Sequence, residues 1–195
     1  MQKIITSSLA LSLSLTALMI GLSLVGTQAE LLLEFNREKI AQGEYWRLLS
    51  SNLVHYGFYH LIMNAAALLL IGVSFLRELP VRAYLGLLLL TTLAVNLGTL
   101  LFNPELAFYR GFSGALHGLL VAGLLLNRLR NPWLSYLGVA LVFAKIIHEH
   151  QADFQANQLQ ALLPVAVAVD SHMYGAIAGL VFFALTWVVA RAKKP

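Results

Sequence analysis

The chain has 195 residues, of which 59% are hydrophobic and only 11% charged, and its mean hydropathy is +0.76. This balance excludes an ordinary soluble domain and is typical of a protein that crosses the membrane several times. The net charge of +4 is too small to indicate nucleic-acid binding, and without cysteine the chain has neither disulfides nor thiolate chemistry. We therefore expect one all-α membrane domain over residues 1–195, in contact with membrane lipid.

Six apolar segments are expected to form the transmembrane helices of this domain. They cover residues 4–25, 58–76, 81–102, 113–126, 133–147 and 172–190. The fourth and fifth are shorter than the ~20 residues of a full crossing, so their ends should lie inside the protein. The first is longer than the ~7–15-residue apolar core of a signal peptide, which favours a retained helix over that alternative. Residues 26–54 mix charged and aromatic side chains and suit the membrane interface, and residues 148–160 form a polar stretch before the turn at Pro164.

The charges are distributed unequally between the two sides of these six segments. The side that holds both termini carries eight of the 13 Lys and Arg residues, whereas the other side carries eight of the nine acidic residues. Basic loops remain in the cytoplasm, so both termini should be cytoplasmic. The second, fourth and sixth segments then begin at the outer side.

Polar and ionisable side chains gather at the outer ends of these three segments. They are His55, His60, Asn64, Ser113, His117, Asp170 and His172. Such groups are costly at membrane depth unless they are paired or functional. One histidine alone would most often be structural, but a group of polar residues at one end of one bundle predicts a functional site.

The stretch from Gly111 to Gly118 can be read as packing material or as a nucleophile site. Small residues four apart, Gly114 with Gly118 and Gly175 with Gly179, allow two helix backbones to approach closely. If these faces meet, Ser113 and His172 reach the same depth. That pair is the minimum for activating a serine hydroxyl, with the serine as nucleophile and the histidine as general base.

Two further observations concern the groups around this pair. His60 and Asn64 are four residues apart on one helix face, from which they could donate to an oxyanion beside the Ser113 backbone. No carboxylate is clearly placed to orient His172, because Asp170 lies two residues away and points to another face of the helix.

An ordered set of motifs resembles the rhomboid intramembrane serine proteases. The motifs are Glu-Tyr-Trp-Arg at 44–47, HxxxxHxxxN at 55–64, Gly-x-Ser-Gly at 111–114 and His-x-x-Gly-x-x-x-Gly at 172–179. The resemblance implies a six-transmembrane-helix rhomboid bundle without metal or organic cofactor. It implies Ser113 as nucleophile, His172 as general base and then acid, and His60 and Asn64 as oxyanion stabilisers.

One position departs from the better-known rhomboids, which carry an aromatic residue, often tyrosine, four residues after the serine. Here it is His117, which could also stack on His172 but can titrate. Gly114, His117 and Tyr174 are expected to lie close to the catalytic pair.

The segments 113–118, 145–149 and 164–175 are similar to those of the rhombosortases, short bacterial rhomboids. This subgroup implies a bacterial inner-membrane enzyme whose active site faces the periplasm. Its substrates would be exported proteins with a C-terminal sorting tail, made of a Gly-Gly motif, one transmembrane helix and a basic end.

Several alternatives stay open from the sequence. Lys145 and Glu149 could form an ordinary i,i+4 ion pair or a contact near the substrate gate. A rhomboid-like pseudoprotease would bind transmembrane clients without cutting them, although it usually lacks the serine or the histidine. A transpeptidase-type sorting enzyme would use the same pair but transfer the acyl group to an amine. A metal or haem protein is suggested only by the six histidines, whose His148–His150 pair does not share a helical face.

Overall fold

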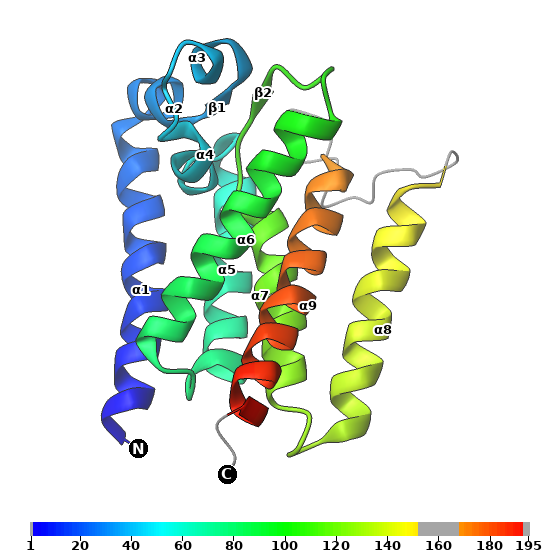
Figure 1. Cartoon of the computed structure of the whole chain (residues 1–195). Helices are drawn as coiled ribbons and strands as arrows, with labels where there is room; N and C mark the ends of the chain where they lie inside the picture. Colours follow the sequence, from blue (N-terminus) through cyan, green and yellow to red (C-terminus); the bar gives the residue numbers. More distant parts are fainter. Residues whose placement is uncertain (1, 152–167, 193–195) are drawn as a thin grey trace.

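The computed structural model describes residues 2–151 and 168–192. Long helices lie side by side as a bundle, and the start of α1 and the end of α9 lie at the same end of it (Figure 1). These helices are α1 (Gln2–Val25), α5 (Gly57–Ile71) with its π-helical extension η2 (Gly72–Leu76), α6 (Val81–Phe102), α7 (Ser113–Leu126), α8 (Pro132–Glu149) and α9 (Val169–Ala192).

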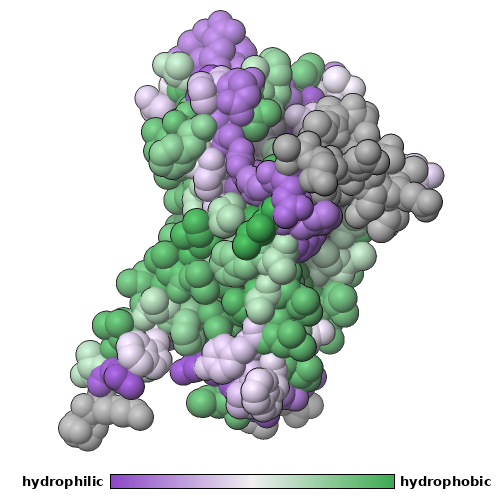
Figure 2. Space-filling model, turned by 90° about the vertical axis from the view of Figure 1, so that its right-hand side faces the viewer, coloured by the Kyte–Doolittle hydropathy of each residue, from purple (hydrophilic) through white to green (hydrophobic). Residues whose placement is uncertain are grey.

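Four of the described helical segments are long and apolar enough to cross a membrane. They are Ser7–Val25, Gly57–Leu76, Val81–Phe102 and Val169–Ala192, and α7 is a shorter apolar helix. The chain is therefore a multi-pass membrane protein. On the face shown in Figure 2, hydrophobic residues cover the middle of the bundle and hydrophilic residues lie mainly toward its ends. The number of crossings stays a prediction, because α7 is shorter than these four and α8, with a lysine and a glutamate in its last turns, is not among them.

The helix boundaries agree closely with the apolar segments, with two differences at the end of the bundle opposite the two termini. Helix α8 continues through Glu149, so this residue and His148 belong to the helix and not to the polar stretch expected over residues 148–160. Helix α9 begins at Val169, three residues before the expected start, which places His172 in its first turn. Residues 152–167, including Pro164, and 193–195 lie outside the described residues.

Short elements from the segment that was predicted to be interfacial cover the end of the bundle opposite the two termini (Figure 1). They are α2 (Thr27–Leu33), β1 (Phe35–Asn36), α3 (Arg37–Ala41), α4 (Arg47–Ser50) and the 3-10 helix η1 (Ser51–Leu53). Strand β1 pairs antiparallel with β2 (Phe108–Tyr109) in the loop between α6 and α7, with Phe35 opposite Tyr109. This pairing joins the interfacial segment to the loop that leads into α7.

Arg47 holds the interfacial segment together from inside. Its side chain is buried and donates to the carbonyl oxygens of Leu31 at 2.9 Å and Glu34 at 2.8 Å. It also pairs with the Glu44 carboxylate at 2.7 Å. A buried guanidinium is stable only when its donors are satisfied, and one side chain here connects three turns of backbone.

Helix α7 occupies the centre of the bundle, with α5, α6, α8 and α9 around it. Its apolar residues face all directions, and most are buried, as expected for a helix surrounded by others. The most extensive contact in the bundle is that between α7 and α9. This contact positions the site described next.

Candidate functional site

Glycines on α7 and α9 let the two backbones touch. A Cβ built on Gly175 would overlap the carbonyl oxygen of Gly114, and one built on Gly179 would overlap the carbonyl oxygen of Gly118. The prediction that these two pairs meet is confirmed, and we call this contact the glycine seam. It leaves no room for a side chain at the crossing, which is the condition for such close helix packing.

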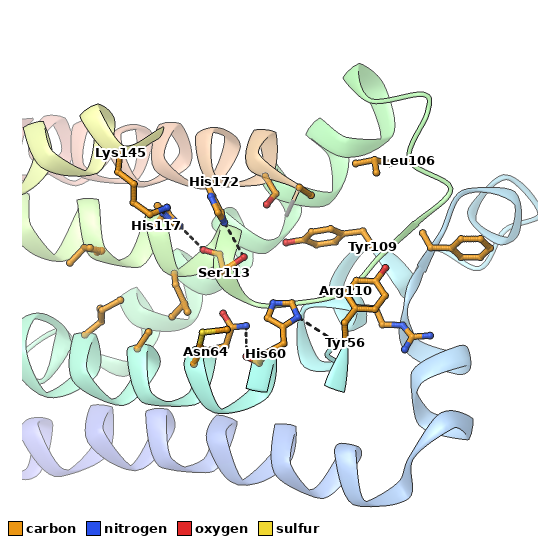
Figure 3. A pocket seen from close by; sticks show the side chains of 18 of the residues that line it. Tyr56, His60, Asn64, Leu106, Tyr109, Arg110, Ser113, His117, Lys145 and His172 are labelled. Carbon is orange, nitrogen blue, oxygen red and sulfur yellow. Dashed lines mark hydrogen bonds between the residues drawn. The ribbon is translucent and has the colours of Figure 1, made fainter. Parts of the chain in front are cut away.

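The glycine seam brings Ser113 and His172 together at the end of the bundle opposite the two termini. The Oγ atom of Ser113 lies 3.2 Å from Nε2 of His172, within hydrogen-bond distance (Figure 3). His172 is buried, whereas Ser113 is half-buried and lines a cavity. A hydroxyl bonded to an unprotonated imidazole nitrogen can give up its proton as it attacks a carbonyl carbon.

Ser113 is the first residue of α7, after a tight turn at Gly111. This glycine has a φ of +125°, a conformation that residues with a side chain rarely adopt. A Cβ at this position would also lie 2.5 Å from Cε1 of His60. The first backbone N–H groups of a helix have no acceptor within the helix and carry partial positive charge. The start of α7 therefore places Ser113 where negative charge is stabilised.

His60 and Asn64 lie one turn apart on α5, and both are buried and line the same cavity as Ser113 (Figure 3). The side-chain amide of Asn64 donates to the carbonyl oxygen of His60 at 2.9 Å, which leaves its second N–H for another acceptor. Nδ1 of His60 accepts from the backbone N–H of Tyr56 at 3.4 Å. The Nε2 side of the His60 ring packs against Gly111, close to the start of α7.

The ring of His55 packs edge-on against His60, with 5.1 Å between their centroids. Burial, together with the neighbouring His60, lowers the pKa of His55 to about 3, so its ring is neutral at physiological pH. Tyr56 stacks on the other side of His60, with 6.2 Å between the ring centroids. These two rings fix the plane of the His60 imidazole.

The ring of His117 stacks on that of His172, with 4.1 Å between centroids and 21° between planes. The stacking expected from the departure at this position is thus present. Nδ1 of His117 lies 2.8 Å from the Ser113 carbonyl oxygen, and its Nε2 lies 3.2 Å from Nζ of Lys145.

Tyr174, which was expected to lie close to the pair, points elsewhere, whereas Asp170 faces away from His172 as the sequence predicted. The hydroxyl of Tyr174 donates to Oδ1 of Asn103 at 2.8 Å, and its ring packs against Gly98 of α6. Because Tyr174 lies two residues after His172, it projects from a different side of α9, the side that packs against α6. The carboxylate of Asp170 accepts from Asn103 at 2.6 Å and contacts Nε2 of His150 at 2.8 Å, so it does not orient His172.

Glu149 makes a contact that the sequence did not predict. Its Oε2 lies 2.9 Å from Nδ1 of His172, and its Oε1 pairs with Lys145 at 2.7 Å. The i,i+4 ion pair is therefore present, but it is only half of the interaction. The available signal was an acidic residue at the outer end of an apolar segment, at the level of the other polar groups. The direction in which α8 turns its last residues could not be read from the sequence.

The cavity beside Ser113 has a volume of about 660 Å³. Its polar end holds Ser113, His172, His117 and Lys145, and its apolar arm runs between α5 and α7. The arm is lined by Met63, Ala67, Ile71, Leu116 and Leu120. Residues 105–110 of the loop that contains β2 line the outer side. Within the described ranges, no group of three or more His, Cys, Asp and Glu side chains could hold a metal ion.

Arg110 anchors this loop to the interfacial segment. Its guanidinium bonds to Glu30 at 2.7 Å and to Glu34 at 2.8 Å, and it lies over the ring of Tyr56. Burial alone would lower the pKa of Arg110, but the Glu34 carboxylate and then Glu30 raise it above its ordinary value. Burial raises the pKa of Tyr56 to about 12, against the opposing charge of Arg110. The loop wall of the cavity is thus fixed by a network of charges.

Comparison with known proteins identifies the fold. The family model named Rhomboid domain matches residues 42–189, about three quarters of the chain. Over 155 residues, 33% are identical to "Putative rhomboid protease YdcA" of Bacillus subtilis (strain 168), a match that covers 80% of this chain and 72% of that protein. The rhomboid protease GluP of the same strain is 33% identical over 99 residues, which are 49% of this chain and 19% of that protein.

A plant protein is similar as well. RHOMBOID-like protein 5 of Arabidopsis thaliana is 34% identical over 101 residues, which are 51% of this chain and 32% of that protein. The matches to GluP and to the plant protein thus span a third or less of those longer proteins. With three quarters of its length matched by the family model, the chain belongs to the rhomboid family.

Proposed function

We propose that the chain is an intramembrane serine endopeptidase in which Ser113 is the nucleophile and His172 the general base. The observation that carries this proposal is the 3.2 Å contact between Ser113 Oγ and His172 Nε2 beside a cavity within an apolar bundle. Two of the similar proteins are named rhomboid proteases, which supports a protease. A pseudoprotease would have no need for this contact.

The reaction follows from the positions of these two groups. Ser113 Oγ attacks the scissile carbonyl carbon while its proton passes to Nε2 of His172, which gives a tetrahedral intermediate and an imidazolium. The C–N bond then breaks, and the proton moves from Nε2 to the leaving amine. Water then attacks the acyl-enzyme while His172 Nε2 takes its proton, which gives a second tetrahedral intermediate. The bond between the acyl carbon and Ser113 Oγ breaks, Nε2 returns the proton to Oγ, and the carboxylic acid product leaves and ionises.

The negative oxygen of the tetrahedral intermediate needs hydrogen-bond donors. We assign this role to the free N–H of the Asn64 amide, to His60 Nε2 in its protonated tautomer and to the backbone N–H at the start of α7. All three belong to residues around the cavity that Ser113 lines. Donors already held in place before the reaction stabilise a developing oxyanion at little reorganisation cost.

We infer that the substrates are transmembrane segments that unwind at the outer end of the bundle. The apolar arm between α5 and α7 suits an apolar side chain near the scissile bond, and small residues ease unwinding of a helical substrate. The resemblance to rhombosortases narrows the proposal to exported proteins with a C-terminal tail of Gly-Gly, transmembrane helix and basic end. On the same resemblance we propose a six-span bundle in a bacterial inner membrane, with cytoplasmic termini and a periplasmic active site.

The test is cleavage of such a substrate by the purified protein in proteoliposomes. The wild type should release a fragment, and both Ser113→Ala and His172→Ala should abolish release. Ser74→Ala, which makes the same chemical change at an exposed position of η2, is the matched control and should cleave normally. Cleavage that survives Ser113→Ala would refute the proposal.

Mass spectrometry of the released fragment tests the type of reaction. Hydrolysis predicts a free carboxylate at the new C-terminus. A fragment that carries an amide to an added amine would instead show the transpeptidase reaction and contradict hydrolysis.

A further inference from the structure

Both carboxylate oxygens of Glu149 are engaged beside the Ser113–His172 pair. Oε2 lies 2.9 Å from Nδ1 of His172, and Oε1 lies 2.7 Å from Nζ of Lys145. The side chains of Glu149 and His172 are only 3% and 5% exposed. A buried carboxylate is costly unless it is paired and hydrogen-bonded, so this arrangement is held by both contacts together.

The contact with Glu149 determines which nitrogen of His172 carries the proton. An ionised carboxylate can only accept hydrogen bonds, so the hydrogen of the neutral imidazole lies on Nδ1. Nε2 then presents its lone pair to Ser113 Oγ at 3.2 Å. This is the tautomer that can take the serine proton.

We propose that Glu149 is a positioning residue that completes a Ser113–His172–Glu149 triad drawn from α7, α9 and α8. The proposal rests on the proposed function, because it assigns a role within that same reaction. When Ser113 loses its proton to Nε2, the imidazolium carries a full positive charge 2.9 Å from the Glu149 carboxylate. Glu149 stabilises this charge and keeps the ring in place, but takes no proton itself.

Lys145 supports the triad from the same face of α8. Its ammonium holds the second oxygen of Glu149 and lies 3.2 Å from Nε2 of His117. Because a lysine ammonium only donates, His117 accepts at Nε2 and donates from Nδ1 to the Ser113 carbonyl oxygen at 2.8 Å. His117 is thereby held as a neutral ring stacked on His172. One turn of α8 thus orients the catalytic imidazole at its edge through Glu149 and at its face through Lys145 and His117. Figure 3 shows Lys145, His117 and His172.

The position of α8 raises the question of whether the contact between Glu149 and His172 is structural or positions the imidazole. The helix lies at the edge of the bundle, where it contacts α7 and α9 (Figure 1). A merely structural tie between α8 and α9 would change stability without changing the chemical step. A positioning role would change the chemical step in protein that remains folded.

The decisive variant is Glu149→Gln, with Glu38→Gln as the matched control at an exposed position of α3. A glutamine amide can either accept from Nδ1–H or donate to a bare Nδ1, so it permits the wrong tautomer. In proteoliposomes, Glu149→Gln should lower kcat by about 10²–10⁴-fold, the range for loss of the orienting carboxylate in a triad. Its KM should stay within about twofold, since Glu149 does not touch the substrate. Glu38→Gln should leave both constants unchanged.

Two further measurements separate positioning from structure. NMR of isotope-labelled histidine should show His172 protonated on Nδ1 in the wild type and in both tautomers in Glu149→Gln, with the signal assigned by its loss in His172→Ala. Glu149→Asp, which keeps the charge, should recover part of kcat. Lys145→Met should lower kcat less than Glu149→Gln does, because it leaves the carboxylate on His172.

The outcomes distinguish this proposal from the proposed function. If Ser113→Ala is inactive but Glu149→Gln keeps kcat within about threefold of the wild type, the triad is overturned while the protease stands. If Glu149→Gln only lowers the unfolding temperature, Glu149 is a structural tie and the positioning role is refuted. A larger loss in Lys145→Met than in Glu149→Gln would also contradict it.

Discussion

The glycine seam predicts a large effect from one added methyl group, in Gly175→Ala. The new Cβ would overlap the carbonyl oxygen of Gly114 and lie 2.6 Å from its carbonyl carbon, whereas ordinary contacts begin at 3.4 Å. The obstacle is backbone and cannot rotate away. Helices α7 and α9 must therefore separate by roughly 0.8 Å or more, which is the shortfall of that one contact.

This separation acts directly on the reacting atoms. Ser113 precedes Gly114 on α7, and His172 lies one turn before Gly175 on α9. Their contact is already 3.2 Å, so a further 0.8 Å would take it beyond hydrogen-bond distance. A misplacement of about 1 Å can lower a rate by about 10²-fold, and overpacking of this kind lowers the free energy of unfolding by about 1–3 kcal/mol.

The assay is kcat for a transmembrane substrate in proteoliposomes, together with the unfolding temperature in the same lipid. Gly21→Ala is the matched control, because Gly21 lies within α1 and nothing lies within 4 Å of its Cβ position. We expect this control to stay fully active and to gain about 0.5–1 kcal/mol of stability from the better helix former. A Gly175→Ala protein that is folded and as active as the wild type would show that close approach of α7 and α9 is not what aligns Ser113 and His172.

Three further predictions concern the surroundings of the site. Arg47→Ala leaves the buried carbonyl oxygen of Glu34 without this donor and should lower the free energy of unfolding by about 1–3 kcal/mol, measured by denaturation in micelles; an unchanged value would contradict its structural role. His117→Ala removes the ring stacked on His172 and should lower kcat by about 10-fold, the equivalent of a strong aromatic contact, whereas an unchanged kcat would show the stack to be incidental. The Ile146 carbonyl and then the Asp170 carboxylate raise the pKa of His150 above 6.5 in the folded protein. The stability that the His150–Asp170 ion pair contributes is therefore complete below pH 6.5 and is lost as the pH rises through the pKa of His150 in the folded state. The unfolding temperature of the wild type should therefore fall toward that of His150→Gln on going from about pH 5 to about pH 8, and a constant difference would refute the ion pair.

Much of the fold was predictable because hydrophobicity alone dictates where helices lie in a membrane protein. The segments 81–102 and 113–126 agree with α6 and α7 residue for residue. The glycine seam was predictable for a similar reason, since four-residue spacing of small residues has few uses other than close packing. These two features bring Ser113 and His172 together.

The contacts of α8 could not be predicted from the sequence. Its last two residues, His148 and Glu149, were expected to lie in the polar stretch that follows the segment 133–147. In the structure these polar groups belong to the helix, and Glu149 reaches His172 of a neighbouring helix. Which way a helix end faces depends on tertiary packing, which no spacing within that helix reveals. Tyr174 is a different case, because its two-residue distance from His172 already indicates another face of α9, which here packs against Gly98 of α6.

The most direct test of the central claim is covalent labelling of the protein with a fluorophosphonate, which reacts much faster with an activated serine hydroxyl than with an ordinary one. Ser113 Oγ contacts His172 Nε2 at 3.2 Å, so mass spectrometry should find the label on Ser113 and on no other serine. The label should be absent in His172→Ala and retained in the control Ser74→Ala. A wild-type protein that cleaves its substrate but takes no label on Ser113, or that is labelled equally without His172, would contradict the account.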